Sequence, residues 1–127
     1  MISPRPAPRI GLDAVDIERF RTSLARTPSM RTRLFVAEEL EYVAPKSDPV
    51  PSLAARFAAR EAVMKVLGVG LGAFGFHEVW VSRLPSGQPL LRVTGRATEL
   101  AGEAGISDWQ VSLTHTATVA MAVVLGS

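Results

Sequence analysis

The residues best suited to chemistry are two acids, a lysine and a histidine from three distant parts of the sequence. Asp13 interrupts an apolar stretch (IGLDAV), Glu61 and Lys65 lie four residues apart in RFAAREAVMKVLGVGLG, and His115 lies in SLTHTAT. Mg²⁺ commonly takes one or two carboxylates and completes its coordination with water and phosphate oxygens. With no cysteine and few histidines in the chain, the two separated acids suit a hard cation. The hydroxyl residues around His115 can bind a phosphate or simply complete a turn.

Each of these residues also has an ordinary structural interpretation. Glu61 and Lys65 have the order and spacing of an ion pair on a helix surface, worth roughly a few tenths of a kcal/mol. Asp13 can face water from an edge strand, and a lone histidine is more often structural than catalytic. The glycines of GVGLG at 68–72 match neither a Walker A loop nor a dinucleotide-binding motif, and they can simply end a helix.

Length and composition indicate one globular domain. The chain has 127 residues, of which 47% are hydrophobic and 20% charged, the balance of an ordinary globular protein. It has no cysteine, which excludes disulfides, thiolate metal sites and a thiol nucleophile. The start lacks the apolar core of a signal peptide, and the longest apolar stretch, 119–125, is too short to span a bilayer. We expect a cytoplasmic protein with no membrane partner, a disordered tail at 1–8 and a domain at 9–127.

Positive charge is concentrated in the first third of the chain. Residues 1–35 contain seven arginines and three acids, a net charge of +4, whereas the remainder carries −2. Arginine favours planar anionic partners, which include nucleic acid, a nucleotide or an acidic protein. The arginines can equally form a solvated face. Only 6% of the residues are aromatic and no nucleic-acid motif is visible, so we expect no nucleic-acid partner. An Arg-rich nucleic-acid-binding module remains the alternative.

The residue pattern predicts short strands and helices that alternate along the chain. The expected strands are 9–15, 78–83, 89–95, 109–115 and 117–125. The expected helices are 16–25, a short one after 27–30, 37–43, 53–67 and 96–104. Asp16 and Ser52 are the expected N-caps, and Ser86-Gly87 is a hairpin signal. Because the strands pair mostly as hairpins, the pattern favours an α+β fold: an antiparallel sheet packed with one long and several short helices.

Three segments, in their order along the chain, resemble the holo-acyl-carrier-protein synthase family, the small 4′-phosphopantetheinyl transferases. They are GLDAVDIERF at 11–20, RFAAREAVMKVLGVG at 56–70 and VSLTHT at 111–116; RLFVAEELEYV at 33–43 is also similar. The resemblance extends from about residue 10 to residue 125. It implies transfer of 4′-phosphopantetheine from coenzyme A to a serine of an apo acyl carrier protein, which releases adenosine 3′,5′-bisphosphate. It also implies Mg²⁺ and a homotrimer with active sites at the subunit interfaces.

The resemblance implies roles for individual residues. Asp13 and Glu61 correspond to the metal-binding carboxylates, and with Lys65, the contact to the pyrophosphate, they form the catalytic set. The implied coenzyme A contacts are Arg56, Phe57, Lys65, Gly68, Gly70, His115 and Thr116, of which His115 and Thr116 are candidates to come from a neighbouring subunit. The implied carrier-protein contact is Arg19, and Arg21 and Arg26 on or near the same helix can steer an acidic carrier by charge. The base that takes the serine proton can be Glu61, Asp16 or a metal-bound water.

Three features depart from the family pattern. Arg60 stands where the family usually has lysine, Asp16 replaces a more usual glutamate, and the segment GVGLG lacks the threonine that the family often has between the first two glycines. Because Arg60 keeps the charge, we expect function to survive. An inactive subunit that keeps the fold and only binds a carrier protein is a further alternative. The complete set of Asp13, Glu61 and Lys65 argues against it.

Overall fold

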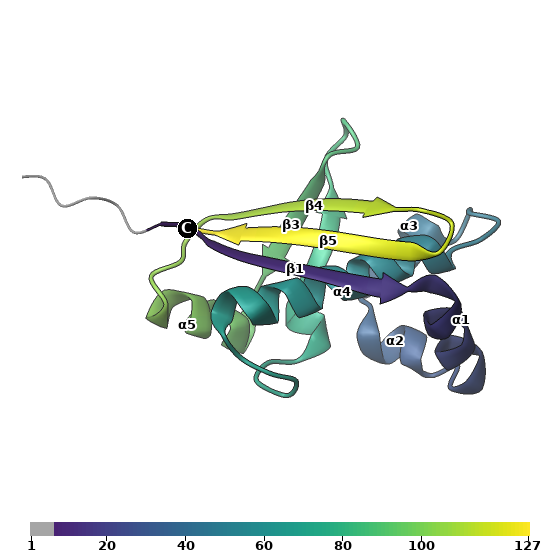
Figure 1. Cartoon of the computed structure of the whole chain (residues 1–127), viewed down its shortest axis with the longest axis horizontal. Helices are drawn as coiled ribbons and strands as arrows, with labels where there is room; N and C mark the ends of the chain where they lie inside the picture. Colours follow the sequence, from purple (N-terminus) through teal and green to yellow (C-terminus); the bar gives the residue numbers. More distant parts are fainter. Residues whose placement is uncertain (1–6) are drawn as a thin grey trace, which may run out of the picture.

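The computed structural model describes residues 7–127, in which one strand is followed by a run of helices and then by two pairs of consecutive strands separated by a helix (Figure 1). Residues 1–6 of the predicted tail lie outside the described residues. The elements, in order, are β1 (Arg9–Asp16), α1 (Ile17–Arg26), α2 (Met30–Leu34), α3 (Ala37–Val43), α4 (Val50–Leu67), η1 (Phe76–Glu78), β2 (Val79–Arg83), β3 (Pro89–Val93), α5 (Gly95–Glu103), β4 (Trp109–His115) and β5 (Val119–Gly126). The predicted α+β class is confirmed.

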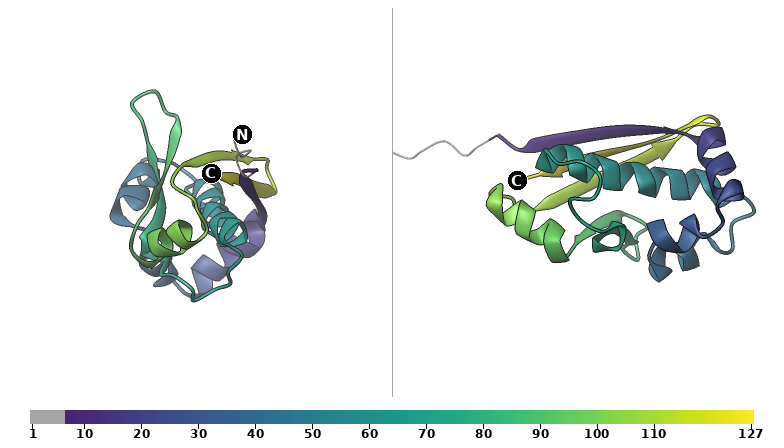
Figure 2. Two further views of the ribbon diagram at one scale, coloured as in Figure 1. Left: turned by 90° about the vertical axis from the view of Figure 1, so that its left-hand side faces the viewer. Right: turned by 90° about the horizontal axis from the view of Figure 1, so that it is seen from below.

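The strands form two antiparallel sheets. One has the order β1-β5-β4, and the other is the β2-β3 hairpin, whose tip projects away from the rest of the chain (Figure 1). In the larger sheet Asp13 is paired with Ala122, and Ala122 with Leu113. Helix α4 runs along one face of this sheet, as the right-hand view of Figure 2 shows. The sheet and α4 therefore form the two layers that position the site.

Helix α4 begins earlier than the sequence predicts. The expected N-cap, Ser52, lies inside the first turn, because the helix starts at Val50 and Pro49 is its N-cap residue. The three prolines between residues 45 and 51 indicate a loop, but a proline fits the first turn of a helix, where its missing N–H would have had no partner. The side chain of Asp48 accepts a hydrogen bond from the Val50 N–H at 3.2 Å. The N-cap at Asp16, in contrast, is confirmed: its carboxylate accepts from the Arg19 N–H at 2.9 Å.

Strand β1 and helix α4 approach each other closely because Gly11 has no side chain. A Cβ atom at this position would overlap the carbonyl oxygen of Ala62. Asp13 follows two residues later and points to the same face of the strand, so it lies beside the next turn of α4. The close contact at Gly11 thus brings a carboxylate of β1 to the surface of the long helix.

No helix among residues 7–127 is long and apolar enough to cross a membrane.

Candidate active site

Helix α4 leaves one strip of its surface unburied. From Leu53 to Leu67 every residue is buried except Phe57, Glu61 and Lys65. These three residues follow one another at intervals of four and therefore share one face of the helix. The edge strand β1 lies beside this face, with Asp13 turned toward α4. Because the rest of this part of α4 is buried, the helix holds these three residues in fixed positions at its surface.

Asp13, Glu61 and Lys65 lie together in the structure. The Lys65 Nζ atom donates to the Leu12 carbonyl oxygen at 2.7 Å and to the Asp13 Oδ1 atom at 3.2 Å. The Asp13 side chain is 19% exposed, whereas that of Lys65 is 55% exposed. Among the ion pairs of the described residues, Lys65 is paired with Asp13 and not with Glu61, so the simple helix-surface pair is not what forms. The sequence-predicted catalytic set converges at one place.

Burial and charge both act on Glu61. Burial raises the pKa of its carboxyl group above the ordinary value, the negative charge of Asp13 raises this pKa further, and Lys65 opposes the change. Two carboxylates that influence each other in this way suit a divalent cation. No group of three or more His, Asp or Glu side chains suitable for a metal occurs in residues 7–127. Asp13 and Glu61 are the two carboxylates at this place, a donor set of the type that Mg²⁺ takes when water and phosphate complete its coordination.

The Glu61→Gln variant is expected to melt at a higher temperature than the wild type at neutral pH, without metal. The raised pKa means that the fold favours protonated Glu61. This contribution is complete below the pKa of Glu in the unfolded chain and is lost as the pH rises through the raised pKa. Glutamine stays neutral, so the difference should vanish below about pH 4. Thermal unfolding with a chelator, with Glu99→Gln as an exposed control, measures it; a wild type that is more stable at neutral pH contradicts the assignment.

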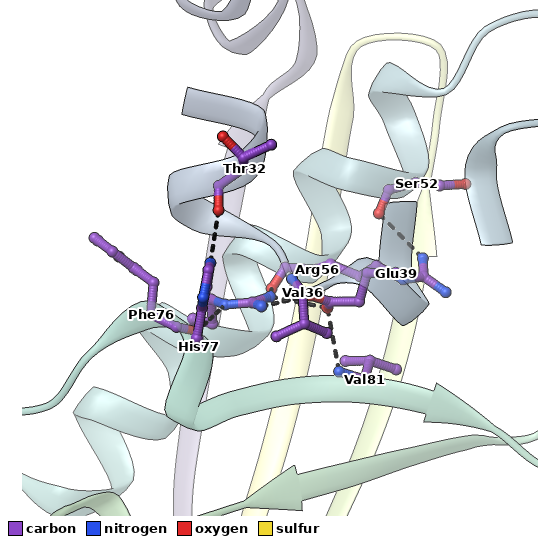
Figure 3. A network of polar contacts seen from close by, with 9 residues as sticks. Thr32, Val36, Glu39, Ser52, Arg56, Phe76, His77 and Val81 are labelled. Carbon is purple, nitrogen blue, oxygen red and sulfur yellow. Dashed lines mark hydrogen bonds and ion pairs between the residues drawn. The ribbon is translucent and has the colours of Figure 1, made fainter. Parts of the chain in front are cut away.

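Arg56 is buried with most of its guanidinium unsatisfied. It is 1% exposed, and its Nη1 donates to the Ser52 carbonyl oxygen at 3.1 Å (Figure 3), but its Nε and Nη2 atoms have no hydrogen-bond partner among residues 7–127. Burial and the nearby charge of Arg83 lower the pKa of Arg56. A buried donor without a partner is costly, so this guanidinium keeps the capacity to donate further hydrogen bonds.

Three cations surround one aromatic ring beside Arg56. The Tyr42 ring centroid lies 4.5 Å from the Arg56 Cζ atom, 4.8 Å from the Arg83 Cζ atom and 5.1 Å from the Lys46 Nζ atom. Sequence reasoning singled out Arg56 but missed Tyr42, Arg83 and Lys46. These residues come from α3, the end of β2 and the loop before α4, and no local pattern connects them. We call Arg56, Tyr42, Arg83 and Lys46 the cationic cluster.

Arg60, for which the resemblance supplies no role, forms a buried ion pair with Glu39. Its Nη1 lies 2.9 Å from Glu39 Oε2 and its Nη2 lies 2.5 Å from Glu39 Oε1, and both side chains are 0% exposed. Its Nε donates to the Phe76 carbonyl oxygen at 2.8 Å. Arg60 and Arg56 are four residues apart and both lie on the buried side of α4. This spacing is the one feature of the sequence that indicates a common environment for the two arginines.

Phe57, Gly68 and Gly70 lie on or just beyond α4. The Phe57 ring centroid is 5.5 Å from that of Phe20 and 6.3 Å from that of Phe76, so this side chain joins α1, α4 and η1. Gly68 ends the helix in the left-handed region, with a φ of 68°, which explains glycine there. Gly70 has no positive φ, and a Cβ atom at this position would meet no atom of the described residues within 4 Å. The fold of this chain does not itself require glycine at position 70.

The structure does not bring His115 and Thr116 to Asp13 within one chain. His115 is exposed at the end of β4, two strands across the sheet from β1 and two residues beyond the Asp13 row. This placement puts it about 10 Å across and about 7 Å along the sheet from Asp13. Thr116 builds the β4–β5 turn, where its Oγ1 accepts from the Thr118 and Val119 N–H groups at 3.2 and 3.1 Å.

The three arginines of the predicted carrier surface differ in their contacts. Arg19 and Arg26 are exposed on α1, and neither forms an ion pair with another described residue. Arg21 instead makes two parallel hydrogen bonds of 2.9 Å to the Asp48 carboxylate and a third to Glu18 at 3.2 Å. These contacts raise the pKa of Arg21 and lower that of Asp48. Arg21 thus ties α1 to the loop before α4 and is not a free charge.

Comparison with known proteins identifies a family for this arrangement. Residues 9–124 match the family model of the 4′-phosphopantetheinyl transferase superfamily. A holo-[acyl-carrier-protein] synthase of Streptomyces avermitilis is 49% identical over 117 residues, which cover 91% of this chain and 94% of that protein. The corresponding synthase of Moorella thermoacetica is 41% identical over 115 residues, which cover 91% of this chain and 90% of that protein.

Solved structures show the same fold. The holo-[acyl-carrier-protein] synthase of Neisseria meningitidis superposes with a TM-score of 0.83 at 28% identity, over 94% of this chain and 97% of that one. The Helicobacter pylori synthase in complex with coenzyme A has a TM-score of 0.77 at 29% identity, over 93% of this chain and 99% of that one. The family match and the high identity over nearly the whole length agree with the site geometry: this chain belongs to the 4′-phosphopantetheinyl transferase superfamily.

Proposed function

We propose that this chain is a holo-acyl-carrier-protein synthase. It transfers 4′-phosphopantetheine from coenzyme A to a serine of an apo acyl carrier protein and releases adenosine 3′,5′-bisphosphate. The observation that carries the proposal is the convergence of Asp13, Glu61 and Lys65 on the open strip of α4. Relatives up to 49% identical bear this name, and the Helicobacter pylori relative was solved with coenzyme A. A cytoplasmic location stays a prediction.

The two carboxylates and the lysine have different roles in phosphoryl transfer. Asp13 and Glu61 would hold Mg²⁺, which when bound neutralises charge on the phosphate oxygens of coenzyme A. Lys65 contacts the leaving phosphate as a point charge. Its half-exposed side chain is paired with Asp13 in the free protein and turns to the phosphate in the complex. The attacking serine loses its proton as it bonds to phosphorus. Because Asp16 caps α1, Glu61 is the better-placed carboxylate to accept that proton.

The cationic cluster suits the anionic end of coenzyme A. Two unpartnered nitrogen atoms of Arg56 can donate to phosphate oxygens, and Arg83 and Lys46 add positive charge close to the Tyr42 ring. Arg56 of the cluster and Glu61 lie on different faces of α4, so one helix can contact two separate phosphate-bearing parts of coenzyme A. Phe57, Gly68, Gly70, His115 and Thr116 remain proposed coenzyme A contacts.

The homotrimer is part of the proposal, and an uncovered apolar sheet face supports it. The side of the larger sheet that faces away from α4 exposes Ile10 at 65% and Leu12 at 53%, and Met121, Val123 and Leu125 of β5 point to the same side. A contiguous exposed apolar surface is typical of an interface. Further copies on this face would also supply the His115 and Thr116 that a single chain holds far from its own Asp13.

Arg21 is expected to act on the carrier protein only indirectly. Arg21→Ala and Asp48→Ala should each lower the urea midpoint slightly, and the double variant should lose less than the sum of the two single losses, because both single variants remove the same pair. Both single variants should leave the KM for the carrier nearly unchanged, whereas Arg19→Ala and Arg26→Ala should raise it through lost charge attraction. A KM rise in Arg21→Ala that Asp48→Ala does not share would restore Arg21 as a direct contact.

The test of the function is a transfer assay. The protein is incubated with coenzyme A, Mg²⁺ and a panel of purified apo carriers of fatty-acid, polyketide and peptidyl type, and each carrier is weighed by mass spectrometry. A gain of one phosphopantetheinyl group on at least one carrier is expected, together with release of adenosine 3′,5′-bisphosphate. No gain on any carrier, with the protein folded and coenzyme A intact, would overturn the proposal and favour an inactive carrier-binding subunit.

A further inference from the structure

The ion pair of Glu39 and Arg60 connects more of the structure than a simple core contact does. Both carboxylate oxygens of Glu39 accept from Arg60, and they also accept from the Val36 N–H at 3.1 Å and the Val81 N–H at 3.2 Å. Arg60 adds its hydrogen bond to the Phe76 carbonyl oxygen. One buried pair thereby joins α3, α4, η1 and the edge of β2 (Figure 3).

The elements that this pair joins include those that carry three members of the cationic cluster, Tyr42, Arg83 and Arg56. Glu39 and Tyr42 are three residues apart on α3, so they lie on neighbouring positions of one helix face. Val81 precedes Arg83 by two residues on β2, so both point to the same side of the strand. The Arg60 Nη1 atom also donates to the Arg56 carbonyl oxygen at 3.3 Å. The pair therefore fixes Tyr42, Arg83 and Arg56 relative to one another.

The pair also sets the charge around Arg56. Among the residues that the structure describes, the buried charged side chains are two arginines, Arg56 and Arg60, and one glutamate, Glu39. Glu39 accepts hydrogen bonds from Arg60. Its negative charge also favours the charged form of Arg56, whereas burial and the charge of Arg83 oppose that form. The buried region thus holds one positive charge more than negative charges. That excess is located at Arg56, the side chain whose donors are unpartnered.

Stability alone is a weak reason for such a pair. Apolar side chains of similar volume often replace a buried ion pair at no loss or with a gain in stability. The surroundings of Arg60 are partly apolar, since its Cζ atom lies 5.2 Å from the centroid of the Phe35 ring. Fixed geometry is the better explanation. We propose that Glu39 and Arg60 are positioning residues for the anionic end of coenzyme A, and that they act through Arg56 and Tyr42. This inference rests on the proposed function.

The experiment compares two conservative variants with a control of similar stability loss. Arg60→Lys keeps the charge but loses the two-pronged geometry, and Glu39→Gln keeps the shape but loses the charge. Ile106→Ala removes core volume beyond α5, away from the pair. Coenzyme A affinity is measured by calorimetry below the melting temperature of each variant, and steady-state kinetics give separate KM values for coenzyme A and for the carrier.

Both pair variants are expected to bind coenzyme A roughly tenfold to a hundredfold more weakly, as small displacements of a positioning group can cause. Their KM for coenzyme A should rise while the KM for the carrier stays nearly constant, and Arg60→Lys should retain more affinity than Arg60→Met. Ile106→Ala should lose stability but keep the wild-type affinity. Tyr42→Leu, which leaves the ion pair intact, should share the loss of affinity.

Each other result has a definite meaning. A wild-type protein that does not bind coenzyme A contradicts the proposed function itself. A wild type that binds while the folded pair variants bind equally well overturns the positioning role, and so does an equal loss of affinity in Ile106→Ala. If the pair variants do not fold, Tyr42→Leu decides: wild-type affinity in that variant overturns the inference.

Discussion

Asp13→Asn and Glu61→Gln are each expected to lower kcat by about a hundredfold to a thousandfold, the loss typical when a group that stabilises transition-state charge is removed. Each change leaves the shape of the side chain but removes one of the two negative charges that suit Mg²⁺. The fold should persist, because Asp13 is partly exposed and because the fold favours neutral Glu61. Initial rates at saturating coenzyme A and carrier, with Mg²⁺ varied, measure the effect.

A second readout separates the loss of metal from the loss of a proton acceptor. Calorimetric titration with Mg²⁺, or with Mn²⁺ as a paramagnetic substitute, should show weaker binding in both variants. Glu99→Gln, which changes an exposed acid paired with Arg96, should leave rate and metal binding at wild-type values. Full activity in both Asp13→Asn and Glu61→Gln would remove the metal assignment, and normal metal binding with lost activity in Glu61→Gln alone would leave that residue as a base only.

The sequence predicts the local features of this site well because local rules determine them. The cap at Asp16 follows from residue preference at a helix start, and the common face of Phe57, Glu61 and Lys65 follows from helix periodicity. Asp13 stands out as an acid within an apolar strand. Its closeness to Glu61 is predicted by family resemblance, and the physical reason becomes visible only in the packing, where Gly11 lets β1 approach α4.

The features that sequence reasoning missed depend on contacts between distant segments. Glu39 and Arg60 are 21 residues apart, and Arg21 and Asp48 are 27 apart, so neither pair has a periodic signal. Arg60 therefore looks like a conservative replacement for lysine, and Arg21 looks like one more charge on a basic helix. Charge alone does not say whether an arginine faces solvent, a partner or a buried carboxylate.

Arg56→Met is expected to change stability and ligand binding in opposite directions. In the free protein the change removes a buried, incompletely hydrogen-bonded charge, so the melting temperature should not fall and is expected to rise. Coenzyme A, however, should bind roughly a hundredfold more weakly or worse, because two charge-assisted hydrogen bonds are lost at a desolvated position. Thermal unfolding with and without coenzyme A, supported by calorimetry, measures both effects on one sample.

The matched control and the choice of ligand make this result specific. Arg96→Met removes an exposed arginine that is paired with Glu99 and should leave the coenzyme A response unchanged. Adenosine 3′,5′-bisphosphate should stabilise the wild type but not Arg56→Met, since it carries the phosphates that the cationic cluster would contact. Pantetheine has no phosphate and should bind both proteins equally. An equal rise in melting temperature with coenzyme A in Arg56→Met and the wild type would show that the unpartnered guanidinium donors serve no anion of this substrate.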